Sequence, residues 1–171
     1  PALPAEPSRG GHPAEQRAGT VLGVAEVLVQ HLHDVEANVD PDKIGAFQQR
    51  LNRKLLAHVD EFTHFDRDTD PQARTLVVAY GVTARAALVA VRESRQAGRP
   101  VSLLTLKTLW PVPERLIVDT AAACDRVVVV EMNMGQYLRE IQRLLPAKTI
   151  DFLGRMNGNL ITPHQIKEVL R

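Results

Sequence analysis

The densest set of side chains that could do chemistry follows an apolar run in the last third of the chain. Glu131, Asn133, Gly135 and Gln136 come directly after Arg126–Val130. A carboxylate and two amides at the end of a buried strand can contact a partner subunit or surround an anion at the next helix N-terminus. The same residues can instead cap that helix, with Gly135 fitting the turn. The residue types alone favour capping, and the contact surface is the alternative interpretation.

Two other sets of reactive residues are weaker candidates. His31, His33 and Asp34 have the spacing of metal ligands on a strand, but no third and fourth ligand accompanies them, so we expect a solvated surface cluster. The single cysteine, Cys124, excludes an internal disulfide, a cysteine-based zinc site and a cysteine-ligated iron–sulfur cluster. We expect an inert, small hydrophobic residue there.

Common nucleotide-binding and nucleophile motifs are absent from the sequence. The run TLVVAYG continues as VTARAA, without the G-x-G-x-x-G that lets a pyrophosphate approach the backbone. Neither a P-loop nor a G-x-S-x-G elbow occurs. We therefore expect no catalytic, cofactor-binding or metal site that this chain completes alone.

Composition narrows the class of protein further. The 171 residues carry a formal net charge of +1, with 44% hydrophobic and 24% charged residues. This balance lacks the basic footprint of a nucleic-acid-binding protein. No apolar run approaches the ~20 residues that cross a bilayer, and no signal peptide opens the sequence, so we expect a cytoplasmic protein without membrane or nucleic-acid partners.

The first part of the chain is predicted to lead into the fold. Residues 1–19 are rich in proline, glycine and charge, which predicts a flexible arm or linker. Residues 20–72 are expected to form a strand and helix lead-in, with an edge strand or a helix over 20–35. Asp40 and Pro41 have the residue types of a helix start, and an apolar stripe follows at helical spacing: Ile44, Phe47, Leu51, Leu55, Val59 and Phe62. The charged residues 64–71 are expected to be a surface connection.

From residue 73 onward the pattern is one of alternating strands and helices. Strands are predicted at 75–80, 101–106, 126–130 and 149–153, and helices at 83–96, from 113, at 135–144 and at 163–170. Apolar, β-branched strands of this kind are buried on both faces. The sequence therefore predicts a three-layer α/β/α, doubly wound, mostly parallel sheet, with residues 20–171 as one domain and 73–171 as its core. Thr83 is predicted to cap a helix, and Trp110 to cover the edge of the sheet.

Four motifs resemble, in order and spacing, a known protein region. They are LVVAYGVTARAA, VSLLTLKTLWPVPERLI, RVVVVEMNMGQYLREI and RMNGNLITPHQIKEVL. They are similar to the carboxyl-terminal region of the alpha subunit of 2-oxoacid:ferredoxin (acceptor) oxidoreductases, particularly the 2-oxoglutarate synthase branch. HDVEANVDPDKIGAFQQRLNRKL extends the likeness loosely, with Ala37 where the family often has glycine. This region of the family has the fold of the transketolase C-terminal domain.

The resemblance implies a role within a larger enzyme. Complete enzymes of this family use thiamine diphosphate, magnesium, iron–sulfur clusters, coenzyme A and ferredoxin to convert a 2-oxoacid to an acyl-CoA. The pyrimidine-binding thiamine domain and the G-D-G…N pattern for magnesium diphosphate are absent from this sequence. The resemblance thus implies a domain that is inactive alone, binds none of these cofactors alone, and packs against the thiamine-binding alpha N-terminal domain and the beta subunit.

The resemblance also changes the weight of the candidate residues. It favours Glu131, Asn133, Gly135 and Gln136 as residues of an interface or active-site rim, and the turn with Arg155 and Asn157 as a second such place. The alternative is a stand-alone α/β interaction or regulatory module that kept the fold without the chemistry. A nucleotide-binding domain is a third hypothesis, weakened by the missing glycine fingerprint.

Overall fold

A computed structural model describes residues 40–171. The chain divides into two units, Pro1–Lys54 and Leu55–Arg171. The predicted arm, the segment 20–35 and the histidine cluster lie outside the described residues, and the domain boundaries proposed from the sequence stay a prediction. Within residues 40–171, no helix combines the length and apolarity required to cross a membrane.

Helix α2 (Pro41–Ala57) begins where the sequence predicts. The Asp40 carboxylate accepts a hydrogen bond from the Asp42 N–H at 3.0 Å, which satisfies one of the first-turn donors. The predicted stripe, however, spans two helices. The backbone leaves helical geometry at His58 (φ −118°), and the short helix α3 (Val59–Phe62) follows.

The predicted surface connection over 64–71 contains a strand, so that prediction is wrong. Strand β1 (Phe65–Asp68) pairs antiparallel with β3 (Ser102–Leu106) in the register Phe65↔Leu106. Because its side chains are mostly charged and largely exposed, the strand has no apolar alternation that the sequence analysis could detect. Such side chains are typical of edge strands, where they discourage pairing with another chain.

The remaining elements alternate as the sequence predicts. They are β2 (Thr75–Tyr80), α4 (Thr83–Gln96), β3, α5 (Glu114–Ala121), β4 (Arg126–Glu131), α6 (Gln136–Leu144), β5 (Thr149–Gly154) and α7 (Pro163–Val169). The strand order is β1-β3-β2-β4-β5, and the pairs among β2–β5 are parallel. The predicted doubly wound, mostly parallel sheet is confirmed.

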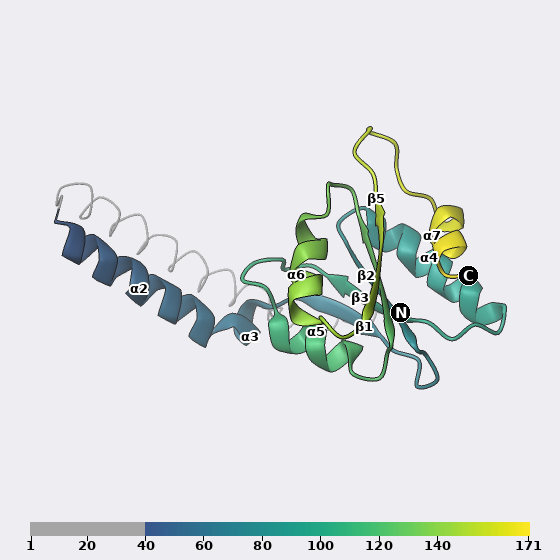
Figure 1. Cartoon of the computed structure of the whole chain (residues 1–171), viewed down its shortest axis with the longest axis horizontal. Helices are drawn as coiled ribbons and strands as arrows, with labels where there is room; N and C mark the ends of the chain where they lie inside the picture. Colours follow the sequence, from purple (N-terminus) through teal and green to yellow (C-terminus); the bar gives the residue numbers. More distant parts are fainter. Residues whose placement is uncertain (1–39) are drawn as a thin grey trace, which may run out of the picture. The chain divides into compact units, whose positions relative to one another are not determined.

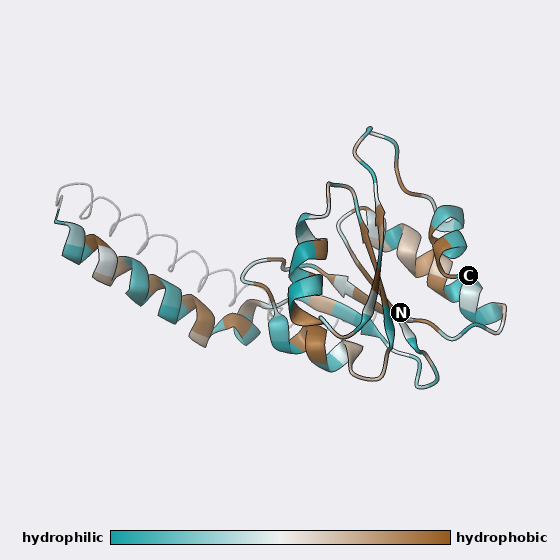
Figure 2. Ribbon diagram, in the orientation of Figure 1, coloured by the Kyte–Doolittle hydropathy of each residue, from teal (hydrophilic) through white to brown (hydrophobic). Residues whose placement is uncertain are grey.

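Side chains that alternate along the strands build a core on each face of the sheet. Leu76 and Val78 of β2 join a cluster with α5 and α6, whereas Val77 and Ala79 join a cluster with α4 and α7. Figure 1 shows these helix pairs on opposite sides of the sheet, and Figure 2 shows their apolar surfaces turned towards it. Cys124 is 2% exposed within the first cluster, and burial raises the pKa of its thiol, in agreement with an inert residue.

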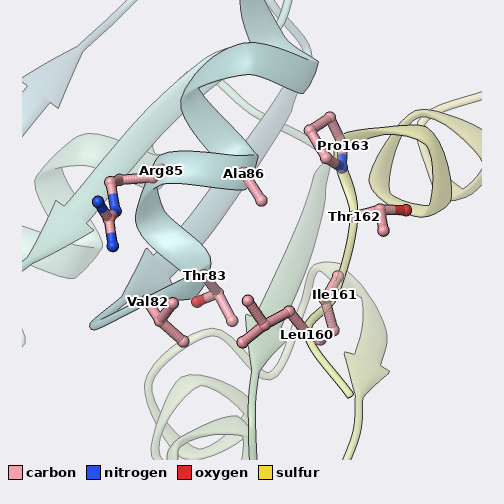
Figure 3. A pocket seen from close by; sticks show the side chains of 8 residues that line it. All are labelled: Val82, Thr83, Arg85, Ala86, Leu160, Ile161, Thr162 and Pro163. Carbon is pink, nitrogen blue, oxygen red and sulfur yellow. The ribbon is translucent and has the colours of Figure 1, made fainter.

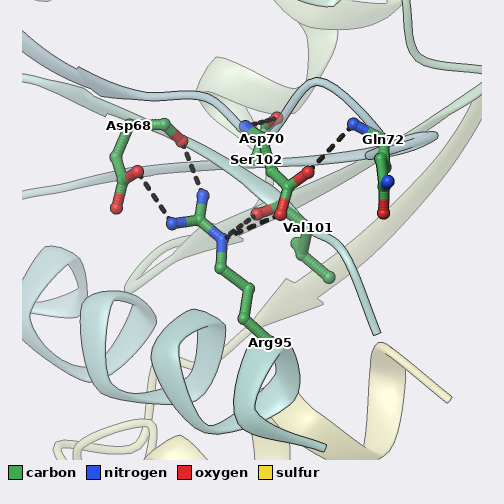
Figure 4. Close-up of polar contacts among 6 residues, drawn as sticks. All are labelled: Asp68, Asp70, Gln72, Arg95, Val101 and Ser102. Carbon is green, nitrogen blue, oxygen red and sulfur yellow. Dashed lines mark hydrogen bonds and ion pairs between the residues drawn. The ribbon is translucent and has the colours of Figure 1, made fainter. Parts of the chain in front are cut away.

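Arg95, at the end of α4, holds the edge strand β1 in place (Figure 4). Its guanidinium donates to the Val101 carbonyl at 2.8 Å, to an Asp68 carboxylate oxygen at 2.8 Å and to the Asp68 carbonyl at 3.0 Å. A neighbouring bond joins the Asp70 N–H to the Ser102 hydroxyl at 3.1 Å. The contacts to Asp68 and the bond between Asp70 and Ser102 link residues 27 and 32 positions apart, so local sequence patterns do not reveal them.

Two side chains differ from their predicted roles. Val82, not Thr83, occupies the N-cap position of α4, and the Thr83 hydroxyl lies 2.7 Å from the Tyr80 carbonyl oxygen and 3.1 Å from that of Val130. Trp110 is 67% exposed and does not cover the sheet edge.

Candidate functional site

The candidate site lies at the carboxyl ends of the parallel strands. Strand β2 leads into α4 on one face of the sheet, whereas its neighbour β4 leads into α6 on the other. Adjacent strands whose connections diverge in this way leave a crevice between their ends, and ligands of doubly wound sheets bind there. Glu131 and its neighbours lie on this loop, as the sequence predicts.

In this chain the crevice is occupied by its own side chains. The Tyr80 hydroxyl, at the end of β2, donates to Glu131 Oε2 at 2.5 Å. The Asn133 side-chain amide donates to the same hydroxyl at 2.5 Å. Burial raises the pKa of Tyr80, and the hydrogen bond to the Glu131 carboxylate raises it further. The hydroxyl therefore stays protonated and bridges the two loops.

Glu131 is turned inward and accepts hydrogen bonds from α6. Its side chain is 0% exposed, although the sequence places it at the rim. Its two carboxylate oxygens accept the N–H groups of Tyr137 and Leu138, each at 3.2 Å. A helix N-terminus attracts negative charge. The chain's own carboxylate thus holds the position that the sequence leaves open for an anionic ligand.

The turn between β4 and α6 is closed by two further side chains. Asn133 Oδ1 accepts the Gly135 N–H at 3.0 Å, and Gln136 Oε1 accepts the Met134 N–H at 3.0 Å. Gly135 has φ +85°, a conformation that favours glycine. The capping interpretation therefore describes the contacts within this chain, while the interface role stays a prediction.

Tyr80 and Tyr137 were not among the residues predicted from the sequence. Their rings meet edge to face, with centroids 5.6 Å apart. The Tyr137 hydroxyl is buried without a hydrogen-bond partner among the described residues, and burial raises its pKa. Tyr80 could have been found from the sequence as a tyrosine at the end of the strand next to that of Glu131. That inference requires knowing that β2 and β4 are neighbours.

The second predicted place lies in the loop after β5. The Arg155 N–H donates to the Glu131 carbonyl at 3.3 Å, so this loop begins beside the first. The Arg155 guanidinium lies 3.5 Å from the Leu160 carbonyl oxygen, and the Asn159 N–H donates to Asn157 Oδ1 at 3.2 Å. The structure therefore brings the Arg155 backbone to the Glu131 loop, while Asn157 remains exposed on its own turn.

An apolar groove of about 320 Å³ lies between the start of α4 and the segment before α7 (Figure 3). Val82 and Ala86 line one side, and Leu160 and Pro163 line the other. The Arg85 guanidinium points away from the groove. The groove therefore presents apolar walls without a convergent acid, base or cation.

Each loop at this edge exposes a large apolar side chain. Val82 follows β2, Trp110 follows β3, Met134 follows β4 and Leu160 follows β5, and these side chains are 42–68% exposed. Exposed apolar side chains gathered at one edge are typical of a surface that contacts another polypeptide. We refer to these four residues as the apolar rim.

Comparison with known proteins identifies the family. Residues 73–166 match the family described as pyruvate:ferredoxin oxidoreductase core domain II. The chain belongs to this family. The match covers the whole alternating region from before β2 into α7, including both loops of the candidate site.

Curated relatives of this core domain II chain are named as subunits of 2-oxoglutarate synthase and ketoisovalerate oxidoreductase. The chain is 29% identical over 132 residues to the 2-oxoglutarate synthase subunit KorA of Methanothermobacter thermautotrophicus, covering 77% of this chain and 35% of the relative. It is 30% identical over 133 residues to the ketoisovalerate oxidoreductase subunit VorB of the same organism, covering 78% of this chain and 38% of the relative. The chain therefore spans little more than a third of their length. The resemblance to the alpha subunit of 2-oxoacid:ferredoxin oxidoreductases, 2-oxoglutarate synthase branch, is confirmed.

Two solved structures share the fold. The 2-oxoglutarate:ferredoxin oxidoreductase from Magnetococcus marinus, with 2-oxoglutarate, coenzyme A and succinyl-CoA bound, has a TM-score of 0.65 at 20% identity, covering 78% of this chain and 23% of that one. A split gene transketolase, an inactive beta4 tetramer, has a TM-score of 0.55 at 17% identity, covering 63% of this chain and 40% of that one. The predicted likeness to the transketolase fold is confirmed.

The described residues of this core domain II chain do not fit a thiamine diphosphate site. The carboxylate at the crevice, Glu131, is fully buried and already accepts hydrogen bonds from three donors of this chain, so it does not face a space that a cofactor could enter. Among residues 40–171, no group of three or more His, Cys, Asp or Glu side chains could hold a metal ion. The geometry suits contact with another polypeptide better than cofactor chemistry.

Proposed function

We propose that this chain is the C-terminal domain of the alpha subunit of a thiamine-diphosphate-dependent 2-oxoacid:ferredoxin oxidoreductase. In the complete enzyme it packs against the thiamine-binding alpha N-terminal domain and the beta subunit, and so supports the active site without being catalytic itself. The observation that carries the proposal is the closed crevice beside an exposed apolar rim. Such an edge offers a surface to another polypeptide but no free catalytic group.

The proposed reaction of the complete enzyme is oxidative decarboxylation of 2-oxoglutarate to an acyl-CoA, with electrons passing to ferredoxin. Relatives named 2-oxoglutarate synthase and ketoisovalerate oxidoreductase have similar identities to this chain, 29% and 30%. The assay is reduction of ferredoxin by the complete enzyme in the presence of coenzyme A, with 2-oxoglutarate and 2-oxoisovalerate compared. Faster reduction with 2-oxoisovalerate would contradict the substrate assignment while keeping the reaction class.

The cofactors of the reaction belong, in this proposal, to other parts of the enzyme. Calorimetric titration of the purified 171-residue chain with thiamine diphosphate and magnesium is expected to give no binding heat, because the Glu131 carboxylate is unavailable. The complete enzyme serves as the positive control in the same titration. Micromolar binding to the chain alone would overturn the division of roles.

The apolar rim provides a direct test of packing. The variant Met134→Asp is expected to weaken association with the other subunits roughly tenfold or more, because it would bury a carboxylate at an apolar contact. Met134 is 68% exposed in the chain itself, so the substitution should not affect the fold of the chain. Subunit association is measured by co-purification and by analytical ultracentrifugation.

The matched control is Val118→Asp, which places the same charge at a 42% exposed apolar position on α5, outside the four loops. It is expected to assemble normally. Equal assembly of both variants with the other subunits would contradict a contact at Met134. If the chain associates with no thiamine-binding subunit at all, the stand-alone module becomes the better description.

A further inference from the structure

Asn157 lies on an exposed turn between β5 and α7, in the sequence Met156-Asn157-Gly158-Asn159. Its side-chain oxygen accepts the Asn159 N–H at 3.2 Å, which folds the side chain back along the following peptide. Gly158 has φ +81° and no neighbouring atom at its Cβ position within 4 Å. The Asn-Gly pair that supports a known cyclisation reaction thus lies on a turn that is open to water.

We infer that Asn157 is a site of spontaneous succinimide formation and deamidation. The Gly158 backbone nitrogen forms a bond to the Asn157 side-chain carbonyl carbon and loses its proton, and the side-chain nitrogen leaves as ammonia. Water then opens the five-membered ring at either carbonyl, which leaves aspartate or isoaspartate. No oxidant, reductant or other co-reactant is consumed besides water.

The turn favours the first step in three ways. Gly158 has no side chain to obstruct approach of its nitrogen to the carbonyl carbon. Its N–H has no hydrogen-bond partner among residues 40–171, so attack by the nitrogen does not require a hydrogen bond to be broken. The Asn159 N–H already points at the oxygen on which negative charge develops during attack, and such a donor stabilises that charge.

The chain contains a matched comparison at Asn133. It lies in Met132-Asn133-Met134-Gly135, and its side-chain oxygen likewise accepts the N–H two residues on, from Gly135, at 3.0 Å. Here the attacking nitrogen belongs to Met134, which carries a side chain and donates to Gln136 at 3.0 Å. The leaving amide of Asn133 is held by the Tyr80 hydroxyl. The two turns therefore share the donor to the side-chain oxygen and differ at the attacking nitrogen and at the leaving amide.

The product would change the charge of the loop between β5 and α7. A carboxylate at position 157 appears two residues from Arg155, whose guanidinium has a carbonyl oxygen 3.5 Å away as its hydrogen-bond partner. The isoaspartate form also lengthens the backbone by one methylene group. The reaction itself does not depend on the proposed function, but its rate reports whether this loop is covered.

The test follows the 171-residue chain over time at neutral and mildly alkaline pH, with peptide mapping by mass spectrometry. We expect aspartate and isoaspartate to accumulate at Asn157, and faster at higher pH because attack needs the deprotonated nitrogen. Half of Asn157 should convert before product is detectable at Asn133. In Asn157→Gln the product at this position should be lost. The urea-unfolded chain gives the intrinsic rates of both asparagines.

Equal conversion at the two asparagines in the folded chain would overturn the inference, as would an intact Asn157 under conditions that convert it in the unfolded chain. A further arm uses the complete enzyme. Slower conversion there than in the chain alone supports an interface at Asn157. Equal conversion in both contradicts the interface that the family resemblance implies at Asn157 and leaves the deamidation site itself intact.

Discussion

Replacement of Glu131 by alanine is expected to lower the free energy of unfolding by about 3–5 kcal/mol. The variant removes the acceptor of three hydrogen bonds, from the Tyr80 hydroxyl and from the N–H groups of Tyr137 and Leu138. Because the site is fully buried, water does not replace the lost acceptor. Urea denaturation of the 171-residue chain, followed by circular dichroism, gives the free energy of unfolding.

Two variants control this result. Glu168→Ala removes an exposed carboxylate of α7 that lies 3.8 Å from His164, and its effect should be below about 1 kcal/mol. Glu131→Gln keeps one acceptor oxygen and places an amide N–H₂ against the donors, so an intermediate loss is expected. A loss for Glu131→Ala no larger than that for Glu168→Ala would show that the buried network does not stabilise the fold.

Replacement of Arg95 by alanine is expected to lower the free energy of unfolding by about 2 kcal/mol. The guanidinium makes three hydrogen bonds, two of them to Asp68 of β1, and its side chain is 24% exposed (Figure 4). Because β1 is an edge strand with no buried side chain, its amide protons should also exchange faster in the variant. Hydrogen exchange measured by mass spectrometry reports this local opening.

The charge and the geometry of Arg95 can be separated. Arg95→Lys keeps the positive charge but loses the forked donors, so its loss should lie between wild type and alanine. Arg115→Ala serves as a surface control, since Arg115 is 85% exposed and lies 3.7 Å from Asp119. Unchanged exchange in β1 for Arg95→Ala would contradict its role as the anchor of the edge strand.

The parts of the fold that sequence alone predicts are those with strong local periodicity. The apolar runs over 75–80 and 126–130 coincide with β2 and with β4 up to its last residue. The α7 start was equally local: the Thr162 hydroxyl accepts the Gln165 N–H, and Gln165 accepts the Thr162 N–H in return. A three-residue spacing determines such a cap, so no tertiary contact is needed to infer it.

The elements missed by the sequence depend on distant residues. Strand β1 has no apolar alternation of its own and is held by β3 and by Arg95, 27 positions from Asp68. The prediction for Trp110 is wrong because the sequence cannot show whether a neighbouring element covers the indole, which is exposed. For the site, residue types pointed to Glu131 and Asn133, but their direction depended on Tyr80, more than 50 positions away.

The sequence by itself determined the alternating strands and helices, the family motifs and the loop on which the candidate residues lie. Those features arise from hydrophobic periodicity and turn chemistry, which act within a few residues. Only the tertiary structure decided that β2 and β4 are neighbours, that Tyr80 bridges their ends, and that Glu131 faces inward while apolar side chains face outward. The direction of a side chain at a strand end is set by which donors and which apolar surfaces the packed strands bring beside it.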